Sequence, residues 1–407
     1  MNNILENSIS DVLVKPIDTA MIPTSNKVDS RTFSRLLDDD KVVASYKMYW
    51  LFGIIEEVTL GNTEIEFNRI VARMIVAAWY PIMQYKLSFG VFDNLQKPIN
   101  YVALKYGFAS NCDESELLKF LCESEDKELK KMMRDLTCMV PYRLLSPFFK
   151  DKLKGQNKSS KNKIIQELSV ESDTCFYKII KEGKNRIIIN EYWAQYLNEN
   201  YRVIKFWIYY KLVCFLQKRN PNVPAIAFKL ESPKNRDLAS PTKIWKEIIV
   251  SKGPKDIYTG KDFTKENYEI YGDLSINHFI PWSFVLHDEM WNLVPTFKNI
   301  NSSKSDKLLN YNRYIDDFCD MQYMAVTHIL EKGKHFCDMQ YMAVTHILEK
   351  GKQKDLESYI DALKIENFQE YLKYKPREEF TKKLKQCISP LYQIAENQGF
   401  EVMDRLF

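Results

Sequence analysis

The feature that most constrains the fold is a change of pattern between about residues 255 and 310. On both sides of this segment apolar residues recur at helical spacing, whereas within it the pattern breaks into short strand and turn signals. Three blocks stand in the segment: IYTGKDF at Ile257–Phe263, INHFIPWSF at Ile276–Phe284 and WNLVPTFKNINSSKSDKL at Trp291–Leu308. We therefore expect an α+β protein, mostly α-helical, that carries one small module containing strands.

The polar residues of these blocks are spaced so that they could meet. Asn277 and His278 precede the apolar sequence FIP, so this pair is expected to end a short strand. Asn292 lies fourteen residues after His278, and Asn301 lies nine residues later, before a run that is typical of a helix start. A His on a strand and an Asn in the first turn of a packed helix can converge on one point. That point could hold a divalent cation and a phosphate.

On these three blocks the segment resembles the HNH, or ββα-metal, endonucleases. Members share a hairpin that ends in a His-hydrophobic-hydrophobic-Pro strand, an Omega loop with a central Asn, and a helix opened by the third motif residue. The YTGK hairpin and the N-x-x-K-S-D helix start are most similar to the HNH domains of RNA-guided CRISPR effectors and related prokaryotic HNH proteins. The resemblance covers about 55 residues, and no bridge helix or second nuclease motif accompanies it. Within the expected Omega loop, His287-Asp288 is predicted to face solvent.

The resemblance implies a role for each motif residue, with His278, Asn292 and Asn301 as the catalytic set. His278 would be the general base that takes a proton from the attacking water, since its unperturbed pKa lies near working pH. Asn277 and Asn301 would contact one Mg²⁺ or Mn²⁺, which would polarise the scissile phosphate. Asn292 would fix the loop to the strand, and Lys304 would balance phosphate charge.

Two departures from the family pattern bear on the site. Members usually carry Asp or His where this chain has Asn277, and a neutral amide binds a hard cation more weakly than a carboxylate does. No structural zinc is expected, because Tyr258-Thr259-Gly260 stands where zinc-binding members have a cysteine pair. The hairpin is expected to be held by packing instead, through Tyr258, Phe263 and Trp291.

The rest of the chain is predicted to be helical apart from a partly ordered polar arm over residues 1–35 and a lysine-rich loop over Lys150–Lys163. Pro81 is expected to stop or kink the second helix. Helices are expected over Lys41–Val58, Glu64–Tyr80, Glu114–Leu136 (one or two), Asn190–Lys218 and Thr242–Val250.

Three domains are predicted: a helical domain for recognition or partner docking over 1–235, an HNH domain over 236–317, and a helical tail over 318–407. The tail contains a tandem duplication with a period of eighteen, because Phe318–Lys334 and Phe336–Lys352 both read FCDMQYMAVTHILEKGK. Eighteen residues make about five turns of helix, so an inserted copy returns every side chain to the same face. This favours a near-neutral duplication over a repeated partner surface.

Charge distribution indicates where a nucleic acid could be held. The net charge of +4 permits a polyanionic partner without requiring one. Residues 236–310 contain ten Lys plus Arg and ten Asp plus Glu, so affinity for a phosphate backbone must come from elsewhere. The best candidates are the loop lysines Lys154, Lys158 and Lys161 and the stretch Lys178–Arg186. The basic and aromatic residues of Lys205–Arg219 could also contact bases, although such a stripe is more often core.

Cysteine usage and hydropathy indicate the compartment. Eight cysteines are present without a C-x-x-C pair, which is typical of a reducing environment. No signal peptide is expected, and the apolar stretches Ile70–Met83 and Phe206–Leu216 are too short or too charged to span a bilayer. We expect a cytoplasmic, soluble prokaryotic protein.

The sequence thus predicts a metal-dependent HNH endonuclease that hydrolyses phosphodiester bonds in DNA, with RNA not excluded, in a restriction or anti-phage defence system. One alternative is a catalytically weak or inactive HNH-fold protein that binds nucleic acid, which Asn277 favours. Another is a nuclease that acts only with a partner subunit docked on the N-terminal region. Because one HNH site makes one cut, cleavage of both strands would point to a homodimer.

Overall fold

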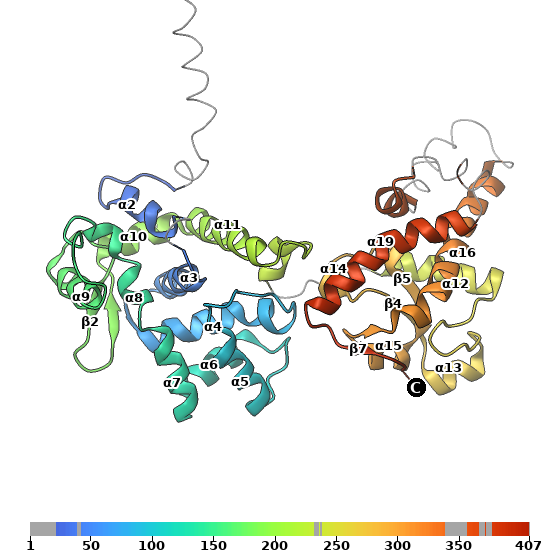
Figure 1. The fold of residues 1–407 in the computed structure, drawn as a ribbon, viewed down its shortest axis with the longest axis horizontal. Coiled ribbons are helices and arrows are strands. Elements are labelled where there is room, and N and C mark those ends of the chain that lie inside the picture. The colour runs from blue at the N-terminus through green and yellow to red at the C-terminus, as the bar shows by residue number, and fades with distance from the viewer. Residues whose placement is uncertain are drawn as a thin grey trace, which may run out of the picture. The chain divides into compact units, whose positions relative to one another are not determined.

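A computed structural model of the chain describes residues 22–38, 42–231, 236, 238–337, 356–365, 371 and 377–406. The chain divides into two compact units: Met1–Pro221 with Ile226–Ser232, and Asn222–Ala225 with Pro233–Phe407. Both units are mostly helical, and the described residues form three small sheets (Figure 1). The expected α+β, mostly helical fold class is confirmed.

The core of the first unit is built on α3 (Tyr46–Thr59), α4 (Phe67–Met83) and α11 (Tyr201–Arg219). Buried residues such as Trp50, Ile54 and Ile75 recur on the facing sides of α3 and α4. Gly53 lets these two helices approach closely, because a Cβ at this position would lie 3.1 Å from Ile70. This close crossing gives α4 a fixed position against α3.

Shorter elements surround this core. Asp113 and Asp126 cap the helices that follow them by accepting hydrogen bonds from first-turn N–H groups. A three-stranded antiparallel sheet has the order β1-β3-β2. The elements are α2 (Ser30–Ser34), η2 (Arg35–Leu37), β1 (Glu64–Glu66), α5 (Gln96–Tyr106), α6 (Glu114–Glu123), α7 (Lys127–Leu136), α8 (Val140–Arg143), η4 (Ser146–Phe149), α9 (Lys161–Glu171), β2 (Lys178–Ile180), β3 (Arg186–Ile188), α10 (Glu191–Glu199) and η5 (Ile226–Leu230).

Several predicted boundaries in this unit are wrong. The first expected helix begins at Tyr46 rather than Lys41, and Glu64 opens strand β1 rather than a helix, since it pairs with Ile188. Helix α4 runs through Pro81 to Met83, so this proline lies in its last turn and does not stop it. The arm over residues 1–35, expected to be partly ordered, contains α2, in which Phe33 is fully buried.

Other predictions for this unit are confirmed. Glu114–Leu136 holds two helices, α6 and α7. Asn190–Lys218 is helical but divides at Asn200 into α10 and α11. The lysine-rich loop is turn structure up to Ser160, and Lys161 begins α9.

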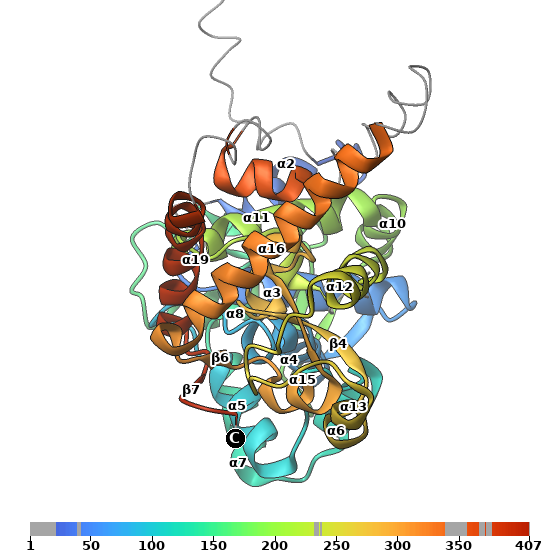
Figure 2. The ribbon, with the colours of Figure 1, turned by 90° about the vertical axis from the view of Figure 1, so that its right-hand side faces the viewer.

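The second unit places a two-stranded antiparallel sheet among helices. Strands β4 (Leu274–His278) and β5 (Leu293–Phe297) pair so that Asn277 faces Val294 and His278 faces Leu293. In Figure 2, α16 runs between α12 and α19, and it packs against both. The remaining elements are α12 (Ala239–Lys252), α13 (Lys265–Tyr271), α14 (Trp282–Val285), η6 (Met290–Asn292), α15 (Lys298–Lys304), β6 (Leu308–Leu309), α16 (Tyr311–Cys337), α19 (Arg377–Asn397) and β7 (Val402–Met403).

Two details of this unit differ from expectation. Helix α13 occupies part of the segment in which only strand and turn signals were expected; Thr264 caps it by accepting from the N–H of Asn267. Helix α15 begins at Lys298, so Asn301 lies in its middle rather than at its first turn.

The helical tail belongs to the same compact unit as the predicted HNH segment. Its first repeat copy, Phe318–Lys334, lies within α16, whereas most of the second copy lies outside the described residues. No helix in the described segments has both the length and the apolarity needed to cross a bilayer.

Candidate active site

Asn292 ties the loop after α14 to the end of β4. Its side chain is fully buried; Oδ1 accepts from the Ile280 N–H at 2.8 Å, and Nδ2 donates to the Ile280 carbonyl at 2.9 Å. The Asn292 carbonyl also accepts from the N–H of Phe279 at 2.8 Å. Both halves of a buried amide are thus satisfied by one stretch of backbone. This is the geometry that a loop-fixing residue requires.

His278 ends β4 with its ring almost fully buried, 4% exposed. Its Nε2 lies 2.7 Å from Oδ1 of Asp288. A carboxylate only accepts hydrogen bonds, so Nε2 carries the proton and the lone pair of the neutral ring is on Nδ1. Burial lowers the pKa of His278, and Asp288 opposes that shift without reversing it. The ring is therefore neutral at pH 7, the state in which it can accept a proton.

The side chain of Lys304 is buried at the end of β4. Its side chain is 1% exposed, and its Nζ donates to the carbonyl oxygen of His278 at 2.8 Å. Burial lowers the pKa of Lys304 to about 7. In this arrangement Lys304 fixes the backbone of His278. The predicted contact with phosphate would require Nζ to give up its hydrogen bond to the His278 carbonyl.

Asn277 and Asn301 meet, as their spacing suggested. Asn277 Nδ2 donates to Asn301 Oδ1 at 2.6 Å. The Tyr258 hydroxyl donates to Asn277 Oδ1 at 2.7 Å, and Asn301 Nδ2 donates to Ser275 Oγ at 2.7 Å and to the Ile276 carbonyl at 3.2 Å. The result is a continuous amide network, running from Tyr258 to Ser275, in which each candidate ligand oxygen already accepts a hydrogen bond.

This donor set fits a divalent cation in kind but supplies no charge. Amide oxygens do ligate hard cations, although carboxylates bind them more strongly. Within the described segments, no group of three or more His, Cys, Asp or Glu side chains could hold a metal ion. An ion held by Asn277 and Asn301 would replace hydrogen bonds that the network now makes, so weak binding is expected.

The prediction that His287-Asp288 faces solvent is wrong. His287 is partly buried with its ring 5.1 Å from that of Trp291, and burial lowers its pKa to about 4. Asp288 is partly buried, with its Oδ1 2.7 Å from Nε2 of His278. The sequence carried one usable signal: an acidic residue in the loop whose two ends are held at His278 and Asn292.

The turn before the strands is held largely as predicted. The carboxylate of Asp256 accepts from the Thr259 N–H at 3.0 Å and from its hydroxyl at 2.6 Å. Tyr258 packs edge-on against Tyr314 at 5.6 Å, and Phe263 lies 5.1 Å from Phe297. These contacts fix the Tyr258 hydroxyl on Asn277.

The predicted phosphate-binding lysines belong to the other compact unit. Lys154 and Lys158 are exposed on the loop, and Lys161 is partly buried. The aromatic stripe of α11 is mainly core, since Trp207 and Ile208 are buried, whereas Phe206 is 60% exposed. A role for these lysines in binding nucleic acid stays a prediction.

A family model described as HNH endonuclease matches residues 256–309. The matched range contains the Asp256 turn, both strands, the Asn292 loop and α15 through Lys304. No curated protein and no solved structure matches the chain. The finer likeness to the HNH domains of CRISPR effectors stays a prediction. Residues 256–309 of this chain are therefore similar to the HNH endonucleases.

Proposed function

We propose that the chain is an endonuclease that hydrolyses phosphodiester bonds in DNA with His278 as its general base. The observation that carries the proposal is the 2.7 Å contact between His278 Nε2 and Asp288 Oδ1. It orients the ring and leaves Nδ1 as the basic nitrogen, which makes no hydrogen bond to any described residue.

In the proposed reaction a water molecule attacks the phosphorus atom while Nδ1 of His278 takes its proton. A new bond joins phosphorus to the water oxygen, and the bond between phosphorus and the 3′ oxygen breaks. The histidine becomes a cation, which the Asp288 carboxylate stabilises across Nε2. Lys304 and Asn292 hold the backbone on either side of the imidazole.

Asn277 and Asn301 are the residues that would hold a Mg²⁺ or Mn²⁺ ion. When bound, such an ion would polarise the phosphate and stabilise charge on the leaving oxygen. The two amides supply only part of a coordination shell. They would therefore suit an ion that binds together with the substrate, whose phosphate oxygens would complete the shell.

Other parts of the proposal concern the wider chain. Lys154, Lys158 and Lys161 would contact the phosphate backbone, and the N-terminal unit would recognise the substrate or dock a partner protein. Cleavage of both strands would need a homodimer. A cytoplasmic setting agrees with the free thiols of the seven cysteines whose side chains are described. A restriction or anti-phage role rests on fold-level association.

A second candidate function is a nucleic-acid-binding protein that retains the HNH shell with little catalysis. The amide network between Tyr258, Asn277 and Asn301 favours it, because hydrogen bonds from other side chains already engage the oxygens of both asparagines. Binding of DNA without cleavage in Mg²⁺ and Mn²⁺ is the result that this candidate requires.

The test is cleavage of supercoiled plasmid by wild-type protein, His278→Ala and the matched control His328→Ala, with Mg²⁺, Mn²⁺ or EDTA. We expect the wild type and the control to nick or linearise the plasmid, and His278→Ala to be slower by about 10²–10⁴-fold. Single-stranded RNA of the same sequence provides the second substrate arm. Equal rates for wild type and His278→Ala would refute the role of His278.

A further inference from the structure

A half-enclosed pocket of about 430 Å³ lies in the first unit, between α3, α4 and α11. Its volume falls in the range of small-molecule sites. Residues one helical turn apart on each helix line it, and Leu230 and Glu231 add the end of η5. All of these elements belong to one compact unit, so the pocket is complete within it.

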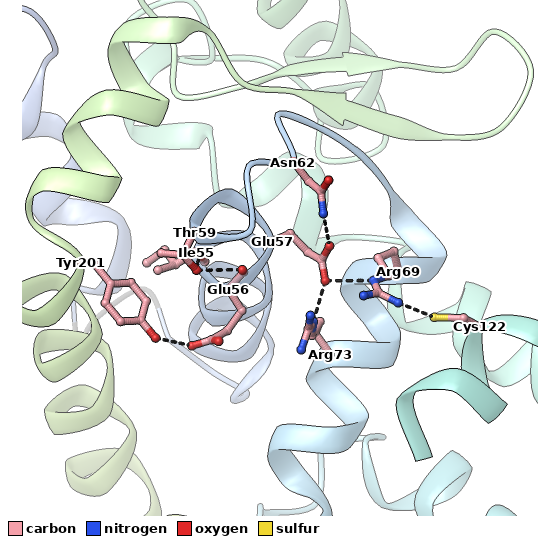
Figure 3. A network of polar contacts seen from close by, with 9 residues as sticks. All are labelled: Ile55, Glu56, Glu57, Thr59, Asn62, Arg69, Arg73, Cys122 and Tyr201. Carbon is pink, nitrogen blue, oxygen red and sulfur yellow. Dashed lines mark hydrogen bonds and ion pairs between the residues drawn. The ribbon is translucent and has the colours of Figure 1, made fainter. Parts of the chain in front are cut away.

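Arg73 presents a fixed guanidinium to this pocket. The carboxylate behind it, Glu57, is 2% exposed and accepts from Arg73 Nε at 2.6 Å, Arg69 Nε at 2.9 Å and Asn62 Nδ2 at 2.8 Å (Figure 3). Burial raises the pKa of Glu57, but these hydrogen bonds outweigh it and hold the pKa below its usual range. Glu57 is thus a charged anchor for Arg73 at neutral pH.

The terminal nitrogens of Arg73 are available to a ligand. Only its Nε bonds to Glu57, and its two terminal NH₂ groups make no hydrogen bond to any described residue. The side chain is 19% exposed and lines the pocket. Arg69 also donates to Glu57, but it lines a different cavity, on the side of Cys122. Of the two arginines, Arg73 alone can reach a molecule in this pocket.

Ion pairs engage the carboxylates nearest Arg73. The Tyr201 hydroxyl donates to Oε1 of Glu56 at 2.9 Å (Figure 3). Lys205 Nζ donates to the same oxygen at 2.9 Å. Arg69, on the other side of Glu57, shares that carboxylate with Arg73. The charged residues that line the pocket are Arg73 and Lys205 with Glu56, Glu114 and Glu231, so the lining sums to −1 and its net charge does not select an anion. The observation that suits phosphate is the guanidinium fork of Arg73, whose terminal NH₂ groups make no hydrogen bond to a described residue.

The rest of the lining suits a flat ring with hydrogen-bond donors. Phe52, Tyr80 and Tyr209 bring aromatic side chains to the pocket, among aliphatic neighbours such as Leu212. Aromatic side chains stack on nucleobases whatever their sequence. Glu231, which also lines the pocket, can accept from the amino or ring N–H groups of a base.

From these observations we infer that the pocket binds a nucleoside monophosphate unit, with its phosphate on Arg73 and its base between the aromatic side chains. The unit is either a free nucleotide or one turned out of a nucleic-acid strand, since both offer the same phosphate and base. The inference does not rest on cleavage at His278, because the pocket lies in the other unit.

The test is binding to the full chain carrying His278→Ala, so that no substrate is cut. Isothermal titration with each deoxynucleoside monophosphate measures the free source, with inorganic phosphate as the minimal probe. Oligonucleotides carrying 2-aminopurine measure the other source, because its fluorescence rises when the base leaves the stack. Saturable binding in either arm, tighter than that of inorganic phosphate, is the expected result.

Two pocket variants and two matched controls identify the site. Arg73→Gln should weaken binding by about tenfold or more through loss of the charged fork. Arg69→Gln removes the other arginine that donates to Glu57 and should leave binding unchanged. Comparing the two variants distinguishes loss of a ligand contact from disruption of the fold around Glu57. Ala77→Trp fills the pocket without touching an ion pair and should abolish binding, whereas Ala103→Trp, on α5, should not. Equal effects of the two arginine variants, or binding in neither arm, would overturn the inference.

Discussion

The Nε2 atom of His278 lies 2.7 Å from Oδ1 of Asp288, at opposite ends of the loop that follows β4. The loop turns back at Leu286, which adopts a left-handed conformation with φ of 57°. Asn292 then closes it on the backbone of Ile280. The same loop therefore supplies the partner of the histidine and the clamp that keeps the partner in place.

Replacing Asp288 by Asn should slow DNA cleavage by about 10–100-fold, the usual effect of removing a residue that orients a functional histidine. An amide can donate to Nε2, which would move the ring proton to Nδ1 and block the basic nitrogen. Glu289→Gln, on the exposed neighbour, is the control and should retain the wild-type rate. A rate for Asp288→Asn within twofold of wild type would exclude this role.

The pH profile of the same reaction carries an independent prediction. Burial lowers the pKa of His278 below its ordinary 6.5, so the neutral base should predominate above pH 6.5. The cleavage rate should be level there and fall as the pH drops through the lowered pKa. In Asp288→Asn the pKa falls further, because the carboxylate raises it, and the acid limb should move to lower pH. A rate that keeps rising between pH 7 and pH 9 would point to another base.

Asn292→Ala should destabilise the second unit by about 2–4 kcal/mol, because it leaves the N–H and the carbonyl of Ile280 without partners in a buried place. Chemical denaturation followed by tryptophan fluorescence measures this loss. Asn299→Ala, on the exposed face of α15, is the matched control and should change the free energy of unfolding by less than about 0.5 kcal/mol. Similar stabilities of the two variants would show that the clamp is dispensable.

Lys304 makes a prediction about stability and pH. Its folded pKa of about 7 lies below that of an unfolded lysine, so the folded state binds fewer protons than the unfolded state between these values. The free energy of unfolding should therefore increase as the pH rises from 7 toward 10, and decrease as the pH falls back toward 7. Lys304→Met should remove this slope and slow cleavage by about tenfold. An unchanged slope would mean that Nζ is not buried in solution.

Local chemistry explains which parts of the site could be predicted from sequence. The position of His278 at a strand end could be predicted, because the apolar residues and the proline that follow it are local in sequence. Asn292 could be identified from its spacing, fourteen residues after His278. The prediction that Asn301 lies in the first turn of a helix was less accurate, because α15 begins at Lys298. Residues that suit a helix start also occur inside a short helix. Helix propensity alone does not separate these two cases.

The partners of the site residues could not be predicted, because they depend on contacts between distant segments. The family resemblance implies that Lys304 balances phosphate charge, yet tertiary packing turns Lys304 onto the carbonyl of His278. Asp288 beside His287 looks like an exposed loop pair, yet the reversal at Leu286 brings it to His278. The amide network from Tyr258 to Ser275 likewise joins three segments whose register only the fold defines.

Asn277→Asp should convert the amide network into a stronger metal site. Without metal the new carboxylate places an acceptor against Asn301 Oδ1, so the 2.6 Å hydrogen bond is lost and the unit should be destabilised by about 1–3 kcal/mol. Mn²⁺ should restore that stability, because a carboxylate binds a hard cation more tightly than an amide, and cleavage should become faster. Thermal unfolding and titration calorimetry, each with Mn²⁺ and with EDTA, measure the two effects, with Asn299→Asp as the control for added charge. If Mn²⁺ stabilises Asn277→Asp no more than the wild type, the ion does not bind at the position that Asn277 occupies.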